Sequence, residues 1–301
     1  MTDGRWWKGN THTHTDRSDG DAPLEEVAAW YEAHGWDFVV VTDHDRVTDV
    51  EGWNARRHRL LLVPGCEVSL SSQGRPVHVN ALSCTRLPRA AAGPTVAATL
   101  QAAVDAVREA GGMPQVNHPN YRWALDEAAL RATQGWALLE IYNASSDCNN
   151  CGGGGRPSVE ALWDRLLAAG RRVFGVAADD AHHWRREWWG HCSPPGRAWI
   201  VVRAPACTPA ALLAAMAQGQ FYASTEVTLD VVTRDGDLLV VEIAPERDFA
   251  YTTRFIGRGG ATLAVVHGLQ ARYRPTGDEG YVRARVSSSN GGLAWTQPWF
   301  L

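Results

Sequence analysis

Short apolar runs and amphipathic stretches alternate along the first two-thirds of the chain. Runs such as 38–41, 60–63 and 173–178 are almost wholly apolar, which is typical of strands buried on both faces of a parallel sheet. Strands are expected to end near residues 12, 41, 63, 80, 118, 142 and 178, and helices are expected over 24–34, 49–57, 96–109, 125–133 and 159–169. Thr95 and Ser158 are expected to cap two of these helices. The alternation predicts an α/β fold with a parallel sheet and right-handed crossovers.

The pattern changes after about residue 195. A strand over 198–202 and a helix over 210–218, capped by Thr208, are followed by short alternating stretches that turn residues separate. Strands are expected there over 228–233, 238–243, 262–266 and 281–286. Turns are expected at Asp235-Gly236 and Asn290-Gly291-Gly292. We therefore expect one domain over residues 1–221 and a small β-rich C-terminal domain over 222–301.

Histidines and carboxylates follow the expected strands one after another. His12 and His14 are two apart, so in an extended strand both imidazoles point to the same face. Asp19 follows on a Ser-Asp-Gly turn that can bring its carboxylate back over the same place. The full set of candidate metal ligands is His12, His14, Asp19, His44, Glu67, His78, His118, Asp180 and His182. Since the C-terminal ends of barrel strands meet at one face, we expect these side chains to converge there.

The donor set restricts the metal and the class of site. Imidazole together with carboxylate suits Zn, Fe or Mn better than Mg or Ca. None of the six cysteines occupies a candidate ligand position, which argues against a structural thiolate zinc site. Cys148 and Cys151 form a single C-x-x-C before a run of four glycines. That motif has two possible interpretations: two reduced thiols on a loop, or a local redox pair.

Composition excludes several other classes of protein. The chain has 301 residues, 45% of them hydrophobic and 21% charged, with a net charge of −4. This is ordinary globular composition, and it gives no reason to expect nucleic-acid or membrane-surface binding. No apolar run approaches the roughly 20 residues of a membrane span. The first residues lack the basic-then-apolar pattern of a signal peptide, so a cytoplasmic protein is expected.

The ordered motifs resemble those of a known family. His12-Thr13-His14, Ser18-Asp19-Gly20, Thr42-Asp43-His44, Glu67, His78, Asn117-His118-Pro119 and Asp180-Ala181-His182 are similar to the motifs of PHP (polymerase and histidinol phosphatase) hydrolases over residues 9–190. Smaller features resemble the branch named for carbaryl hydrolase: Glu140-Ile141-Tyr142-Asn143, Asp179-Asp180, His182-His183 and Ala294-Trp295-Thr296-Gln297-Pro298. The resemblance implies a distorted (β/α)7 barrel with a metal site at its top.

The same resemblance implies two or three divalent ions, of Mn, Fe or Zn. One ion would bind His12, His14, Glu67 and Asp180; a second would bind Asp19, His44 and His182; a third would bind Glu67, His78 and His118. Glu67 would then be shared between two ions, and a shared carboxylate offsets the repulsion between close dications. Such a cluster can lower the pKa of a bridging water, polarise the electrophilic oxygen and stabilise the leaving oxygen.

Other residues near the motifs are candidates for proton transfer or substrate binding. Asp43 and Asp179 can orient an imidazole or transfer a proton. His183 and His191 are candidate proton donors to the leaving group, although both can be ordinary loop histidines. Arg17, Arg122 and Arg185 can hold a phosphate, or can be solvated surface residues. Trp123 and Trp184, with Trp188 and Trp189, can stack on an aryl group or base, or pack in the core. Asn143, within the second resemblance, is a candidate substrate contact.

The expected function is that of a metal-dependent hydrolase, with a phosphoesterase acting on a small phosphorylated metabolite or nucleotide as the first hypothesis. The same site can serve a carboxylic ester, carbamate or amide hydrolase, because hydroxide attacks phosphorus and carbonyl carbon alike. A catalytically silent metal-binding domain is a third hypothesis, against which the apparently complete ligand set argues. The oligomeric state is left open.

Overall fold

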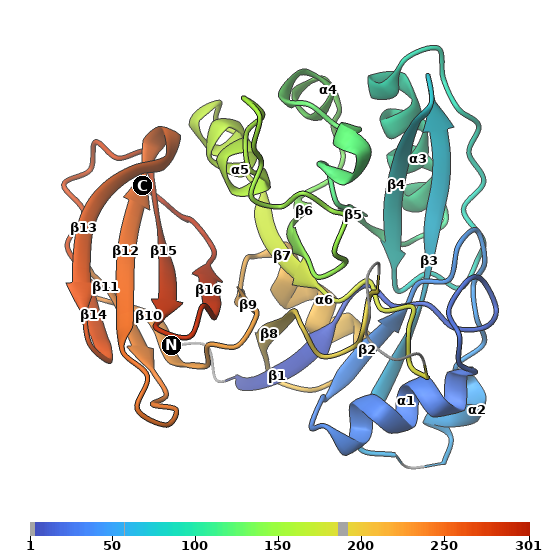
Figure 1. The fold of residues 1–301 in the computed structure, drawn as a ribbon, viewed down its shortest axis with the longest axis horizontal. Helices are drawn as coiled ribbons and strands as arrows, with labels where there is room; N and C mark the ends of the chain where they lie inside the picture. The colour runs from blue at the N-terminus through green and yellow to red at the C-terminus, as the bar shows by residue number, and fades with distance from the viewer. Residues whose placement is uncertain (1–3, 57, 186–191) are drawn as a thin grey trace.

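The computed structural model describes residues 4–56, 58–185 and 192–301 and shows a mixed α/β protein (Figure 1). Its first seven strands are neighbours in chain order within one large sheet. They are β1 (Arg5–Asn10), β2 (Phe38–Val41), β3 (Leu61–Ser72), β4 (Arg75–Leu82), β5 (Met113–Val116), β6 (Leu138–Asn143) and β7 (Phe174–Ala178). The segments that leave β1 and β7 also meet, through a parallel bridge between Thr13 and Ala181. This bridge brings the first and the seventh strand end together.

Helices connect most of these strands. They are α1 (Leu24–Ala33), α2 (Glu51–Asn54), α3 (Val96–Glu109), α4 (Glu127–Ala132), α5 (Val159–Ala168) and α6 (Pro209–Ala217). The expected caps are present, since the side chains of Thr95, Ser158 and Thr208 each accept a hydrogen bond from the backbone of the first turn. Figure 1 shows α3, α4 and α5 along one side of the sheet, with α1 and α2 near the opposite end.

The expected parallel order fails at β4. Strands β1–β2–β3 and β5–β6–β7 are parallel, but β4 runs antiparallel to both of its neighbours. β3 and β4 form a long hairpin joined by Gln73 and Gly74, which both have positive φ (54° and 74°). Two successive residues with positive φ are the signature of a tight turn whose twist matches its strands. The sequence predicts two separate short strands, over residues 60–63 and 77–80. It does not predict that they form a hairpin.

The C-terminal region is rich in strands, and it continues the large sheet. Its strands, with those that join it to the barrel, are β8 (Trp199–Ala204), β9 (Phe221–Ser224), β10 (Leu229–Asp235), β11 (Leu238–Ile243), β12 (Tyr251–Gly257), β13 (Ala261–His267), β14 (Gln270–Tyr273), β15 (Tyr281–Ser288), β16 (Leu293–Thr296) and β17 (Trp299–Phe300). β8 pairs with β1, β9 with β8, and β16 with β9. β10, β11 and β14 form a separate three-stranded sheet. Strands β9, β12, β14, β16 and β17 were not expected, and the boundary at 221/222 stays a prediction.

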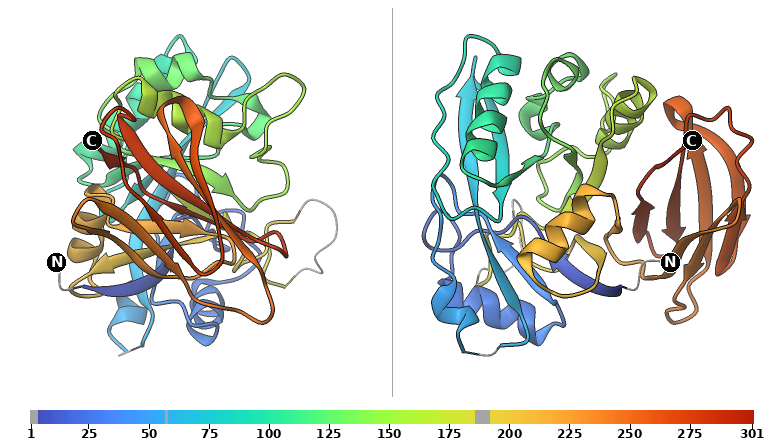
Figure 2. Two further views of the ribbon diagram at one scale, coloured as in Figure 1. Left: turned by 90° about the vertical axis from the view of Figure 1, so that its left-hand side faces the viewer. Right: turned by 180° about the vertical axis from the view of Figure 1, so that it is seen from behind.

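The right-hand view of Figure 2 shows the C-terminal strands to one side of β1–β7 and their helices. A buried ionic network joins them to α5. Asp164 on α5 accepts hydrogen bonds from Arg283 Nε (2.9 Å), Arg283 Nη2 (2.7 Å) and the Tyr281 hydroxyl (2.9 Å). Arg283, which is fully buried, also pairs with Glu160 at 2.8 Å. Among the described residues, no helix combines the length and apolarity needed to cross a membrane.

We predict that Asp164→Asn destabilises the protein by about 3 kcal/mol, because a buried arginine then loses one of its two carboxylate partners. Equilibrium urea unfolding of purified protein measures the loss. The matched control is Glu127→Ala, which removes a partly exposed carboxylate paired with Arg131 and Arg165. It should cost no more than about 1 kcal/mol. Equal effects of the two changes would show that the Asp164–Arg283 pair does not anchor the C-terminal strands.

Candidate metal centre

All nine side chains that the sequence marks as candidate ligands meet around the ends of the first seven strands. They lie after β1 (His12, His14, Asp19), after β2 (His44), within β3 (Glu67), within β4 (His78), after β5 (His118) and after β7 (Asp180, His182). Their ligand-type atoms form four overlapping groups, in each of which the atoms lie within 4.8 Å of one another: His14–Asp19–His44–His182, His12–His14–Asp180, His12–Glu67–His118 and His44–Glu67–His78. The cluster opens into a pocket of ≈ 230 Å³.

Glu67 occupies the centre of the cluster and is 1% exposed. Its Oε1 lies 3.1 Å from His78 Nδ1 and 3.3 Å from His118 Nε2. Its Oε2 lies 3.3, 3.4 and 3.1 Å from nitrogens of His12, His14 and His44, respectively. One carboxylate therefore contacts five imidazoles, an arrangement that suits a ligand shared between ions.

Asp180 joins the two histidines of the first motif. Its Oδ1 lies 3.1 Å from Nε2 of His12 and 3.1 Å from Nε2 of His14. The two imidazoles therefore reach one carboxylate oxygen, as their spacing of two residues predicts. The expected strand position is wrong in detail, because β1 ends at Asn10 and the histidines follow it. Their direction is set instead by the bridge to the segment after β7, where His14 N donates to Ala181 O (2.9 Å) and Asp180 N donates to His12 O (3.0 Å).

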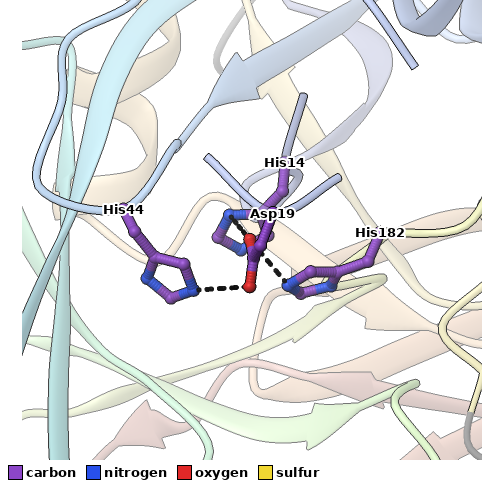
Figure 3. Close-up of side chains that lie close together, drawn as sticks. All are labelled: His14, Asp19, His44 and His182. Carbon is purple, nitrogen blue, oxygen red and sulfur yellow. Dashed lines mark ion pairs between the residues drawn. The ribbon is translucent and has the colours of Figure 1, made fainter. Parts of the chain in front are cut away.

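Asp19 lies above the buried cluster and is the most exposed of the nine, with 55% of its side chain accessible. Figure 3 shows its carboxylate among three imidazoles. Oδ1 lies 3.7 Å from His14 Nδ1 and 3.4 Å from His182 Nε2, and Oδ2 lies 3.4 Å from His44 Nε2. The loop that carries Asp19 therefore folds back over the strand ends, as the Ser-Asp-Gly turn predicts.

Two features hold this loop in place. Asp43, fully buried, accepts hydrogen bonds from Thr15 N (2.7 Å), Thr15 Oγ1 (2.8 Å) and Ser18 Oγ (2.8 Å), and also from the Thr48 hydroxyl. Gly20 packs so closely on the preceding segment that a Cβ there would lie 2.7 Å from His14 O. Only glycine allows that approach, which brings Asp19 over the cluster.

The charges of the cluster are strongly coupled. Burial alone would raise the pKa of Glu67, but the nearby imidazoles, foremost His12 and His78, outweigh it and hold the pKa well below its usual range. The rings of His14 and His182 stack at 4.1 Å, so two positive charges there would repel. Burial and His182 lower the pKa of His14 to about 4. Burial opposes the charge on His182 too, yet Asp180 and Asp19 raise the pKa of His182 to about 9.

The residues present fit a metal centre. The donors are six imidazoles and three carboxylates, a set that suits Zn, Fe or Mn. The Nε2 atom of His12 indicates a metal ligand most directly. It is buried and has no hydrogen-bond partner, although two carboxylate oxygens lie within 3.3 Å. A buried polar atom without a partner is costly, and a cation between it and the carboxylates would satisfy all three. No cysteine belongs to the four groups formed by the described residues.

The other predicted site residues fall into different places. Asn143 is buried behind the cluster, where its Nδ2 donates to Glu140 (2.9 Å) and to Asp180 (3.1 Å). Asp43 holds the loop described above, and Asp179 accepts backbone hydrogen bonds from residues 196–198. Neither aspartate lines the pocket in the described part of the chain. Their contacts fit positioning roles better than proton transfer.

His183 does line the pocket, and its Nδ1 accepts a hydrogen bond from Ser193 N (3.0 Å). His191, Trp188 and Trp189 lie outside the described residues. The Nε1 of Trp184 donates to His14 O (3.3 Å), and its ring contacts Tyr31, so this tryptophan packs behind the first motif. His183 therefore faces the pocket, whereas Trp184 packs against the segment that carries His14.

The arginines and Trp123 are not among the described residues that line the metal pocket. Arg185 pairs with Glu26, and Arg17 is 63% exposed near Asp16. The guanidinium of Arg122 lies over the ring of Tyr121, 5.5 Å from its centroid. Trp123 lines a separate depression and stacks with Arg156. Arg122 adjoins the pocket through Tyr121, which lines it, and Arg185 lines a neighbouring depression together with Asp19, His182 and His183.

Sequence reading missed two sets of residues at the site. Glu140, fully buried on β6, lies 2.9 Å from His12 Nδ1, but the sequence places it only in the second family resemblance and gives it no role at the metal site. Besides that resemblance, the sequence offers one signal, a carboxylate inside a run of apolar strand residues. Tyr121 and the segment 145–148 form pocket wall, with Cys148 buried and Cys151 exposed. Nothing local marks these loop residues as pocket-forming.

We predict that Glu67→Gln removes more than one ion, because it abolishes the charge that several imidazoles share while keeping the side-chain volume. Metal affinity should fall by more than the roughly 10- to 100-fold typical of residues outside direct contact with a metal. Elemental analysis of metal-loaded, gel-filtered protein measures the content. His78→Ala is the matched comparison and should deplete mainly one ion, since His78 belongs to one of the four groups. Full metal content in Glu67→Gln would rule out a shared carboxylate.

No protein-family model matches the chain, and no curated protein matches it. The structure is similar to that of a two-domain protein of Bacteroides vulgatus that contains a predicted PHP-like metal-dependent phosphoesterase, with a TM-score of 0.56 and 15% identity over 99% of this chain and 96% of that one. A provisionally assigned metal-dependent phosphoesterase of Bifidobacterium adolescentis has a TM-score of 0.41 and 15% identity over 62% of this chain and 92% of that one. An amidohydrolase of Chromobacterium violaceum with bound sulfate has a TM-score of 0.42 and 17% identity over 62% of this chain and 93% of that one. Both TM-scores are too low to support an argument.

The first of these likenesses covers almost the whole of both chains. At 15% identity it establishes the fold and leaves the activity open. The closer resemblance to the carbaryl-hydrolase branch stays a prediction. The chain therefore has the mixed α/β fold of a PHP-like protein, as its ordered motifs predict.

Proposed function

We propose that the protein is a metal-dependent hydrolase, and that it cleaves phosphomonoesters or phosphodiesters of a small metabolite or nucleotide. The observation that carries the proposal is the convergence of nine ligand-type side chains in four overlapping groups at the bottom of one pocket. A structural site would need only one such group, closed to solvent. Here several groups share ligands and face an open pocket, as substrate access requires.

His12, His14, Glu67 and Asp180 would hold one ion, Asp19, His44 and His182 a second, and Glu67, His78 and His118 a third. The members of each set contact one another through a shared carboxylate, although the four groups of the described residues place His78 with His44 and His118 with His12. Divalent ions bound there would lower the pKa of a water molecule and polarise the phosphoryl oxygen. Two or three ions of Mn, Fe or Zn fit this donor set.

The protein's own pocket residues would bind the substrate and stabilise the leaving group. Because Nδ1 of His183 accepts a hydrogen bond from Ser193 N–H, a neutral His183 carries its proton on Nε2. This N–H can donate a hydrogen bond to a leaving oxygen, so His183 is the preferred residue for stabilising the leaving group. Tyr121 and the hydroxyls of Ser145 and Ser146 line the pocket and can contact the part of the substrate that leaves.

A carboxylic ester, carbamate or amide hydrolase is the second candidate. The observation in its favour is that the described residues lining the pocket include no arginine or lysine, whereas Asp147 is among them. A neutral substrate needs no cation beyond the metal ions, so this pocket suits it also. Residues 1–221 would form the hydrolase domain in either case, since the four ligand groups of the described chain all lie there.

The direct test is a hydrolysis screen of Mn-, Fe- and Zn-loaded protein. p-Nitrophenyl phosphate, bis-p-nitrophenyl phosphate, nucleotides and neutral aryl esters are the substrates, and Glu67→Gln is the negative control. We expect phosphoesters to be cleaved with the higher kcat/KM. Faster cleavage of neutral aryl esters would favour the second candidate. Full metal content without turnover of any substrate would favour a silent metal-binding domain.

Arg122→Ala distinguishes the two substrate classes. An exposed guanidinium near the pocket contributes about 1 kcal/mol to an anionic contact, which corresponds to roughly fivefold in kcat/KM. We therefore expect kcat/KM to fall about fivefold for phosphoesters and to stay unchanged for neutral aryl esters, with metal content intact. Arg131→Ala, an arginine on α4 paired with Glu127, is the matched control. An equal loss on both substrate classes would mean that Arg122 acts by supporting Tyr121 and not through its charge.

A further inference from the structure

Glu140 is a buried carboxylate whose contacts all go to the candidate metal centre or its support. It lies on β6 and is fully buried. Its Oε1 lies 2.9 Å from His12 Nδ1, and its Oε2 accepts hydrogen bonds from the backbone N–H of His118 (2.7 Å) and from Asn143 Nδ2 (2.9 Å). Asn143 Nδ2 in turn donates to Asp180 Oδ2 (3.1 Å). One side chain thus connects ligand candidates that follow β1, β5 and β7.

An irregularity in β6 makes this arrangement possible. In the pairing with β7, Glu140 faces Val176 and Tyr142 faces Ala177, so Ile141 is an extra residue in β6. Residues three apart in a regular strand point to opposite faces of the sheet. One extra residue reverses the later side chains and brings Asn143 to the same face as Glu140. The local geometry therefore places both side chains at the cluster.

The contact with Glu140 decides which nitrogen of His12 is available to a metal. An ionised carboxylate can only accept, so Nδ1 of His12 must carry the proton that it donates to Glu140. A neutral His12 then has its lone pair on Nε2, the buried atom without a hydrogen-bond partner beside Glu67 and Asp180. A metal ion binds the unprotonated nitrogen of an imidazole, so Nε2 is the atom of His12 that can bind it.

Glu140 also holds His118 in an unusual backbone conformation. The φ of His118 is +23°, outside the regions favoured by residues with a side chain. The hydrogen bond from its backbone N–H to Glu140 fixes this conformation, in which His118 Nε2 lies 3.3 Å from Glu67 Oε1. Strain at such a site persists only when surrounding contacts hold it.

From these contacts we infer that Glu140 is a positioning residue that fixes His12 as the Nδ1–H tautomer and directs the imidazoles of His12 and His118 to the metal ions. This role extends the proposed function, because it explains how ligands from separate strands are oriented before any ion binds. Carboxylates behind metal-binding histidines typically contribute 10- to 100-fold to metal affinity.

Glu140→Gln is the test variant. The amide keeps the volume and can still accept from His118 N–H, but an amide N–H₂ facing His12 requires Nδ1 to accept, which moves the proton to Nε2. We expect the apparent Zn²⁺ dissociation constant, from competition with a chelating indicator, to rise 10- to 100-fold. The visible absorption of Co²⁺-loaded protein should change as well, since a ligand is displaced.

Asp164→Asn is the matched control, because Asp164 is an equally hydrogen-bonded buried carboxylate outside the metal centre. It should lower thermal stability while leaving Zn²⁺ affinity and the Co²⁺ spectrum unchanged. Unchanged Zn²⁺ affinity in Glu140→Gln would overturn the inference. Equal weakening in Asp164→Asn would also overturn it, because the effect would then reflect general stability.

A measurement on the unmodified protein covers the case in which Glu140→Gln does not fold. Long-range ¹H–¹⁵N correlation spectra of Zn²⁺-loaded protein report which nitrogen of each histidine carries a proton. We expect the proton of His12 on Nδ1, and a proton on Nε2 would overturn the inference. All these readouts concern metal binding, so a failure to cleave any phosphoester would contradict the proposed function and leave the inference standing.

Discussion

Glu67 is almost fully buried and has five imidazoles around its two oxygens. A buried carboxylate is stable only when positive charge or hydrogen bonds replace the water that it has lost. The imidazoles come from segments after β1, β2 and β5 and from β4, so the charge of one side chain constrains the ends of several strands at once. Two further features position imidazoles around Glu67. They are the bridge between Thr13 and Ala181 and the loop that carries Asp19.

Three further buried carboxylates support this centre from behind. Asp43 holds the loop of residues 15–18, Asp179 holds the backbone of residues 196–198, and Glu140 holds His12 and His118. Each accepts hydrogen bonds mainly from backbone N–H groups, hydroxyls or imidazoles. These contacts restrain the ligands that lie on loops, and restrained ligands lose less conformational entropy when they bind metal ions.

The C-terminal strands contribute to the structure without entering the metal centre. β16 pairs with β9 and so continues the large sheet, while the Asp164–Arg283 pair fixes β15 to α5. Gln297 makes hydrogen bonds with both the N–H and the C=O of Gly175 in β7 (2.8 Å each), which lies three residues before the end of that strand. These contacts stabilise the strand that leads to Asp179 and Asp180.

The sequence by itself determined the positions of most strands and helices, the helix caps and the identity of the nine side chains that converge. Apolar runs, caps and spacings of two residues are local features, and their physical causes act within a few residues. Only the tertiary structure decided that β3 and β4 form an antiparallel hairpin, that Trp123 faces another depression, and that Glu140 and Asn143 share one face of β6. These outcomes depend on strand partners and on one extra residue in the β6–β7 register, which are contacts between segments far apart in the chain.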